Sequence, residues 1–385
     1  AAEAEAEAEA HPDRDAADAP LKRRRMEYTR SPPARRACRS RSPRRPRANH
    51  LEPRAGARGW LEWPVAATAD GQERWRVAKP QPRSMLLQCE ARKEPHTAVD
   101  REGVAVVYKP AYWTMTTTGP NEEPVVRSKM PRIQSWLVQN LGGQYPFVKD
   151  NPRAGLVHRL DVQTSGPILV ATNAETFEEM RWNLRRKRWY KEYITLMHGV
   201  VPPKRSSGTL NYKLFTKRDR GNGWRTEVNA RKGEDAQTKY EALAAYRCRS
   251  LERGNTQRYT LLRVQLITGR THQIRVHLAE FARELGLQVR GIVGDYKYLP
   301  FEQVRADRRL CSRVFLHAQQ LHFPAPGSRA PPFRVKCPMP QELRRALASL
   351  ELDERTTEQF RECVRRAPAL PSEHEACGAP LPVLP

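Results

Sequence analysis

The sequence is poor in apolar residues and has no long apolar run and no paired cysteines. Hydrophobic residues make up 39% of its 385 residues, and no stretch approaches the roughly eighteen apolar residues that a membrane-spanning helix needs. The seven cysteines are scattered, odd in number and never arranged as CxxC, which argues against a disulfide framework and against a zinc site of paired thiolates. Residues 1–20 contain no apolar segment typical of a secretory signal. We therefore expect a reducing, intracellular compartment, without choosing between cytoplasm, nucleus and organelle.

Acidic residues are also scarce relative to basic ones. Asp and Glu number 43 against 68 Lys and Arg, which gives a formal net charge of +25. A charge of this size indicates a polyanionic partner, with nucleic acid ahead of an anionic membrane surface. The chain lacks an amphipathic helix with the wide apolar face that binding to a membrane surface requires. We therefore expect a nucleic acid as partner and no membrane contact.

Charge and residue pattern divide the chain into four parts. Residues 1–60 are a predicted disordered tail, with a net charge of −6 over its first twenty residues and +12 over the next forty, which include SPPARRACRSRSPRRPR. Residues 61–100 show little periodicity and receive no assignment. Residues 101–340 carry strand and helix patterns and form the predicted main domain. Residues 341–385 combine one helix-like stretch, QELRRALASLELDERTTEQFRECVRRA, with a Pro-rich end.

Within the main domain, strand patterns and helix patterns interleave. The β-branched run GVAVVYK, which starts at residue 103, predicts a buried strand that ends at Lys109-Pro110, because proline cannot extend a central ladder. Further strands are predicted in PILVATN, KEYITLMHGVV, TKYEALAAY and YTLLRVQLITG. Helices are predicted in IQSWLVQNLGG, TFEEMRWNLRRK and THQIRVHLAEFARELG. The order lacks a regular βαβ rhythm, so we predict an α+β domain with a mixed sheet.

The densest group of chemically active residues lies in GLVHRLDVQTSGPILVATN, residues 155–173. His158, Arg159 and Asp161 place a titratable ring, a cation and a carboxylate on a connection between core strands, where catalytic groups are often presented. The simpler interpretation is an Asp that caps its own turn. A hydrolase triad with Ser165 is disfavoured, because GxSxG is absent and three members within eight residues could hardly converge.

Metal sites have little support. His272 and His277 are five residues apart, which is off the helical face that a zinc pair needs, and His317 and His322 repeat that spacing without an HExxH motif. The zinc deaminase signature is absent as well. We therefore expect no metal.

Two further groups combine cations with turn-forming or aromatic residues. In ITGRTHQIRVHLA, Gly269 permits a tight turn, Thr271 can cap the next helix, and Arg270 and Arg275 supply cations, although an ordinary charged helix start would look the same. In KRWYKEYITLMHG, Tyr190 and Tyr193 lie among basic residues. Such interleaving suits base stacking with phosphate contact, but a Tyr at a strand start is commonly packing.

Together these segments resemble the RluA-type pseudouridine synthases. HRLDVQTSG is similar to the family's HRLDxxTSG signature, KEYITLMHG to its KxY segment, and ITGRTHQIRVHLA to its TGRTHQIRVH segment. GIVGDYKY and VFLHAQQLHFPAP are similar to the two motifs that follow, PIxGDxxY and LHAxxLxFxHP, and VVYKPAYW to the opening KPxG strand. The resemblance covers roughly residues 103–326, in the family's order.

The resemblance implies a largely antiparallel sheet with flanking helices, a central RNA-binding cleft, and isomerisation of uridine to pseudouridine in ribosomal or transfer RNA. It implies that Asp161 is the catalytic carboxylate, with Arg275 keeping it ionised, Tyr193 lying against a flipped-out base and Arg159 filling the vacated place in the stack. The other implied RNA contacts are His158, Arg270 and Lys191. Because no redox change occurs and no atoms enter or leave, we expect no cofactor. We also expect a monomer.

The chain departs from the family pattern in three places. Pro167 replaces the usual Leu, Tyr112 replaces the glycine of KPxG, and LHFPAP lacks the final His. None of these changes removes a residue with an implied chemical role. The alternative hypothesis is a catalytically inactive RNA-binding factor for ribosome assembly on the same scaffold. Retention of Asp161, Tyr193 and Arg275 argues against it.

Overall fold

The computed structural model describes residues 83–86, 93–101, 103–115, 130–219, 223–249, 256–327 and 332–366. The predicted tail of residues 1–60 and the Pro-rich end after residue 366 therefore lie outside the described residues. Within the described part the fold is α+β, with largely antiparallel sheets and flanking helices, which confirms the predicted fold class.

The largest sheet in the described part has eight strands. Its order is β1-β13-β12-β5-β11-β10-β14, with β6 paired to β10, and every pair is antiparallel except β1 with β13. The strands are β1 (Arg83–Leu86), β5 (Tyr190–His198), β6 (Ser207–Leu210), β10 (Thr238–Arg249), β11 (Thr256–Leu266), β12 (Leu316–Phe323), β13 (Phe333–Lys336) and β14 (Glu351–Leu352). Every residue of the central strand β5 is buried. Strand β1 joins this sheet from a part of the chain to which the sequence assigned no structure.

Two smaller sheets are also antiparallel. One consists of β2 (His96–Arg101), β3 (Val104–Lys109) and β4 (Gly166–Ala171), and the other of β7 (Lys213–Asp219), β8 (Gly223–Val228) and β9 (Glu234–Asp235). Strand β3 is buried throughout and ends at Lys109, directly before Pro110, as predicted. Gly166 begins β4 with φ 140°, where an added Cβ would lie 2.5 Å from the Ala318 carbonyl oxygen of β12. A side chain here would therefore separate the two sheets.

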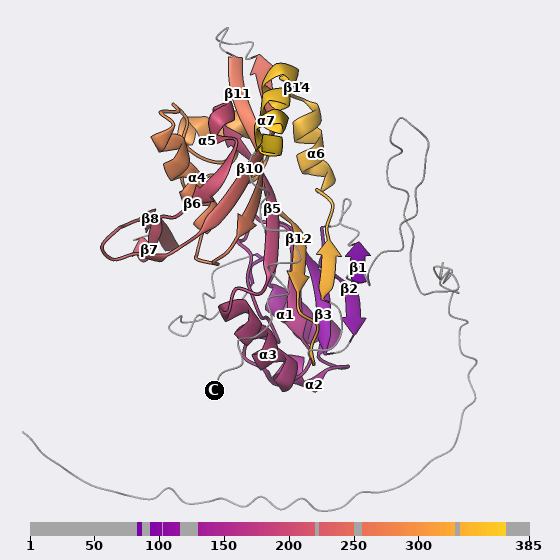
Figure 1. Ribbon diagram of the computed structural model, residues 1–385. Coiled ribbons are helices and arrows are strands. Elements are labelled where there is room, and N and C mark those ends of the chain that lie inside the picture. The colour runs from indigo at the N-terminus through magenta and orange to yellow at the C-terminus, as the bar shows by residue number, and fades with distance from the viewer. Residues whose placement is uncertain are drawn as a thin grey trace, which may run out of the picture. The chain divides into compact units, whose positions relative to one another are not determined.

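Helices cover these sheets. They are α1 (Ile133–Leu141), α2 (Pro146–Asp150), α3 (Ala174–Arg185), α4 (Gln273–Glu284), α5 (Phe301–Asp307), α6 (Gln341–Ala348) and α7 (Glu354–Arg366), with a short 3-10 turn at Pro203–Arg205. Helix α3 begins where the Asn173 side chain accepts the Thr176 N–H at 2.8 Å. The contacts pack α3 on β4, α4 on β8 and β10, and α7 on β10, and Figure 1 shows α7 beside β10.

One predicted helix was wrong in its extent. Its described residues, 341–366, form two helices, α6 and α7, separated by the short strand β14, which pairs with β10. Helix α7 begins directly after Asp353, because the side chain of Asp353 accepts the Thr356 N–H at 3.1 Å and so caps the helix. Phe360 of α7 is fully buried in the main core, so this part of the chain packs into the same body.

Candidate functional site

A cavity of about 470 Å³ opens where the connection before β4, the end of α3, strand β5 and the start of α4 meet. Seven cations line it, and Asp161 is the one carboxylate among its described lining residues. The cations are Arg153, Arg159, Arg185, Lys187, Lys191, Arg270 and Arg275. Its volume lies in the range of small-molecule sites, and its charge suits a polyanion.

The loop that carries Asp161 is fixed by a buried lysine. Lys109, at the end of β3, is fully buried, and its Nζ donates to the carbonyl oxygens of Pro110 (2.9 Å), Val162 (3.1 Å) and Thr164 (2.7 Å). The Thr164 N–H in turn donates to the Asp161 carbonyl oxygen at 3.0 Å. Burial, followed by the charge of Arg313, lowers the pKa of Lys109 well below its usual value. The main chain directly after Asp161 is therefore held from within the core.

Arg275 of α4 links Asp161 to a second carboxylate. Its guanidinium donates from Nε and Nη2 to the two oxygens of Asp295, at 2.8 and 2.5 Å, and from Nη1 to Asp161 at 3.4 Å. Side-chain exposure is 4% for Arg275 and 1% for Asp295 but 21% for Asp161. Asp295 therefore orients the guanidinium, and Asp161 is the more exposed of the two carboxylates and the one that lines the cavity.

Asp161 is ionised at neutral pH. Burial raises the pKa of its carboxyl, but the opposing effects of His272, Arg275 and Arg159 are larger together, so that the pKa lies below its usual value. Burial lowers the pKa of His272 to about 4, which leaves that ring uncharged at pH 7. The cations that favour the carboxylate at neutral pH are therefore the two arginines.

Strand β5 contributes an aromatic ring and a titratable cation to the cavity. Burial and the charge of Asp161 raise the pKa of Tyr193, so its hydroxyl stays protonated. Burial lowers the pKa of Lys191 to about 8. Tyr193 is paired through its main chain with Val264 of β11 and Ala318 of β12, so the ring stands on the most central strand of the sheet.

The remaining predicted site residues, Arg159, Arg270 and His158, also line the cavity, but they differ in exposure, hydrogen bonding and charge. Arg159 is exposed. Arg270 forms an ion pair with Glu234 of β9 and donates from Nε to the Asp235 carbonyl oxygen at 3.4 Å. His158 accepts the Leu169 N–H at Nε2 (2.9 Å), and burial lowers its pKa to about 3. The His158 ring is therefore neutral at pH 7 and contributes to the cavity wall without a charge.

Thr271 does not cap the following helix as predicted. Residue His272 precedes α4 in the left-handed region, with φ 52°, and makes no side-chain cap. The Gln273 side-chain oxygen instead accepts the Arg270 N–H at 2.9 Å and the Thr268 hydroxyl at 2.8 Å. Because Tyr298 accepts the Thr226 N–H, its hydroxyl proton is free to be donated to His272 Nδ1 at 2.8 Å. This contact holds the ring beside Asp161.

The sequence patterns predict no chemical role for Lys109, His272, Asp295 or Tyr298, although all four belong to the segments that resembled family motifs. Within the described part of the chain, no three or more His, Cys, Asp or Glu side chains come together as a metal site would require. No helix in that part is long and apolar enough to cross a membrane.

Comparison with known proteins agrees with the motifs. Residues 103–280 match the family model described as RNA pseudouridylate synthase. The chain is 35% identical over 226 residues to the ribosomal large subunit pseudouridine synthase D of Xylella fastidiosa, covering 56% of this chain and 61% of that protein. It is 32% identical over 173 residues to the tRNA pseudouridine synthase C of Haemophilus ducreyi, covering 44% of this chain and 66% of that protein.

Among solved structures, the human RNA pseudouridylate synthase domain containing 1 aligns with a TM-score of 0.48 at 20% identity, over 70% of this chain and 95% of that one. The chain spans less than two thirds of the length of the Xylella relative. The matched region contains β3, Asp161, Tyr193 and Arg275, and it includes the segments HRLDVQTSG, KEYITLMHG and ITGRTHQIRVHLA in family order. On this agreement of sequence and motif order, residues 103–280 belong to the RNA pseudouridylate synthase family, and their motifs are similar to those of its RluA-type members.

Proposed function

We propose that this protein isomerises specific uridines in RNA to pseudouridine, with Asp161 as the catalytic carboxylate acting on a flipped-out nucleotide. The single observation that carries the proposal is the arrangement at the cavity: one ionised carboxylate, held by Arg275, in a site whose other charged lining residues are Arg and Lys. The names of the bacterial relatives support ribosomal or transfer RNA as the substrate class.

The proposed reaction breaks the bond between ribose C1′ and the ring nitrogen, turns the uracil while it stays bound, and joins C1′ to ring carbon 5. The proton released from carbon 5 takes the place of the lost bond at the nitrogen, so atoms and electrons balance without an oxidant or reductant. Asp161 acts as nucleophile or base in this sequence. Its depressed pKa supports the anionic role at neutral pH.

The cationic lining supports binding of the target nucleotide with its neighbouring phosphates. Extruding a base from a stack costs a few kcal/mol, and base stacking on an aromatic ring contributes about 1 to 3 kcal/mol. In the proposal Tyr193 supplies that ring inside the cavity, and the exposed Arg159 fills the space that the base leaves. In the proposal Lys191, Arg270 and Arg185, which line the cavity, contact phosphates.

Replacing Asp161 tests the proposal. Asp161→Asn keeps the shape of the side chain but removes the anion, so pseudouridine formation should fall by about 10³-fold or more, while RNA affinity stays within about threefold. The substrate is found first by mapping pseudouridine across cellular RNA with and without the protein. Asp353→Asn, the same chemical change at the start of α7, is the matched control and should retain activity.

Full activity of Asp161→Asn on that RNA would remove Asp161 from the mechanism. A wild-type protein that binds ribosomal RNA but forms no pseudouridine in any cellular RNA would favour the inactive assembly factor instead.

A further inference from the structure

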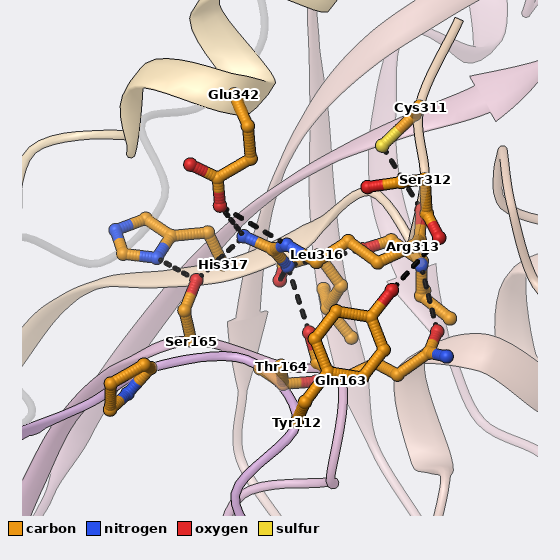
Figure 2. Close-up of polar contacts among 12 residues, drawn as sticks. Tyr112, Gln163, Thr164, Ser165, Cys311, Ser312, Arg313, Leu316, His317 and Glu342 are labelled. Carbon is orange, nitrogen blue, oxygen red and sulfur yellow. Dashed lines mark hydrogen bonds and ion pairs between the residues drawn. The ribbon is translucent and has the colours of Figure 1, made fainter. Parts of the chain in front are cut away.

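Arg313 is a fully buried arginine that lies three residues before β12 and reaches the loop that carries Asp161. Its side-chain exposure is 1%. Nη1 donates to the carbonyl oxygens of Gln163 (2.8 Å), Val314 (3.2 Å) and Leu316 (3.0 Å), and Nη2 donates to the Ser165 hydroxyl oxygen at 2.8 Å. Figure 2 shows this guanidinium between the loop, β12 and Glu342. Its position lies beyond the region matched by the family model.

The contact with Ser165 belongs to a directed chain of hydrogen bonds. The carbonyl oxygen of Cys337 can only accept, so His317 Nε2, 2.9 Å away, donates to it. Burial lowers the pKa of His317 to about 3, and the neutral ring must then accept at Nδ1 from the Ser165 hydroxyl, 2.9 Å away. The lone pairs of that hydroxyl are left to accept from Arg313. Each group therefore has one defined role, which fixes the Ser165 side chain.

The loop and the Arg313 segment also bind each other in the reverse direction. The Gln163 side-chain oxygen accepts the Val314 N–H at 3.0 Å, and the Ser165 carbonyl oxygen accepts the Ala318 N–H at 2.9 Å. Arg313 donates a hydrogen bond to the carbonyl oxygen of residue 163, and Lys109 donates hydrogen bonds to those of residues 162 and 164. Two buried basic side chains thus hold three consecutive carbonyls directly after Asp161.

The charge of Arg313 is balanced from the C-terminal part of the fold. Glu342 of α6 accepts from Nη2 at 3.1 Å and from Nε at 3.3 Å, and its side chain is 48% exposed. Tyr112, which stands in the glycine position of KPxG with φ 67°, donates its hydroxyl to the Ser312 carbonyl oxygen at 2.9 Å and its N–H to the Val162 carbonyl oxygen at 2.7 Å. This departure from the family pattern adds a second link between the same two segments.

We propose that Arg313, balanced by Glu342, is a positioning residue for Asp161 that couples the C-terminal helix α6 to the geometry of the candidate active site. The proposal rests on the proposed function for its kinetic effect. A misplacement of about 1 Å in an active site can cost about 10²-fold in rate. Arg313 touches the loop after Asp161 and does not line the cavity, so its loss should affect turnover more than RNA binding.

The experiment compares the full chain with Arg313→Lys, Ser165→Ala and the double variant. Lysine keeps the charge but lacks the planar fork. On the RNA that wild type modifies, the single-turnover rate of Arg313→Lys at saturating RNA should fall about 10- to 100-fold, with the Kd for RNA within about threefold. Ser165→Ala deletes one hydroxyl, and its single-turnover rate should fall about 3- to 10-fold. The double variant should resemble Arg313→Lys, because both changes break one connection.

Hydrogen exchange separates positioning from general stability and requires no activity. In Arg313→Lys the amides of residues 161–166 should exchange at least about tenfold faster than in wild type, while those of α7 stay unchanged. Arg258→Lys is the matched control. It alters an arginine that forms an ion pair with Asp353 at 2.8 Å, far from the loop in sequence, and it should leave both the rate and the loop amides as in wild type.

A wild-type rate in Arg313→Lys, losses that multiply in the double variant, or exchange that rises equally in loop and α7 would each overturn the proposal. If Arg313→Lys does not fold, Ser165→Ala alone decides by the same two measurements. An inactive wild type would sink the proposed function, and the exchange comparison would still decide whether Arg313 positions the loop.

Discussion

Lys191 is the cavity residue whose charge changes closest to neutral pH. Burial lowers its pKa to about 8, so the free side chain is charged below that pH and neutral above it. If it contacts a phosphate, RNA affinity should fall about three- to tenfold as pH rises from 7 to 9. Lys191→Arg keeps its charge and should remove most of this fall. RNA titrations across that range test this, and identical pH curves for the two proteins would exclude a phosphate contact.

A residue of the candidate site could be predicted from the sequence where its neighbours along the chain also belong to that site. Asp161 stands between His158 and a turn, and Arg275 lies beside a turn with further cations, so local patterns marked both as candidates, but only the family resemblance implied their roles. Lys109 and Asp295 escaped because their roles come from partners far away in sequence: Lys109 binds carbonyls more than fifty residues on, and Asp295 orients a guanidinium twenty residues earlier. Contacts between residues so far apart in sequence cannot be predicted from residue spacing.

At the scale of elements, Asp353 decides where the last helix begins. Its side chain accepts the Thr356 N–H and pairs with Arg258. Asp353→Ala should lower the free energy of unfolding by about 1 kcal/mol through the lost cap, whereas Asp353→Asn keeps an accepting oxygen and should lose less than about half of that. Thermal or urea unfolding measures both, and equal losses would mean that the ion pair, not the cap, carries the effect.

The contribution of Asp353 to the free energy of unfolding should depend on pH. Hydrogen bonding to the Thr356 N–H, against an opposing effect of burial, holds the pKa of Asp353 below its usual value. A carboxylate whose pKa is lower in the folded protein stabilises the fold at pH values above its unfolded pKa of about 3.9. This stabilisation is lost as the pH falls through the folded-state pKa. The gap between wild type and Asp353→Ala should therefore narrow below about pH 4.

Elements with a one-sided apolar pattern were predictable, and those without it were not. Helix α1 was indicated by the stripe of Ile133, Trp136, Leu137 and Leu141, and it buries all of these except Trp136, which is half-buried. The hairpin of β7 and β8 was missed because KLFTKRD and GWRTEV offer few apolar residues, and most of their described side chains are only partly buried or exposed. Such strands depend on pairing with each other and on contacts such as the Thr226 N–H to Tyr298.

For the whole molecule, charge is the property that sequence predicted most directly. The body from residue 61 onward carries a formal +19, and the structure gathers seven cations around one carboxylate in the cavity. Composition could not show that gathering, because it arises from four separate elements. The tail of residues 1–60, which lies outside the described residues, adds a further segment of charge whose role we propose to be phosphate contact and not chemistry.

Deleting residues 1–60 tests that role. Residues 21–60 carry +12, and each phosphate contact adds about 0.7 to the salt slope on single strands. The truncated protein should bind RNA more weakly, with a flatter dependence of log Kd on log salt, yet keep its rate at saturating RNA within about twofold, because phosphate contacts position and do not catalyse. Deleting only residues 1–20, which carry −6, is the control and should leave binding equal or tighter. An unchanged salt slope after the longer deletion would show that the tail does not contact RNA and would favour a targeting role.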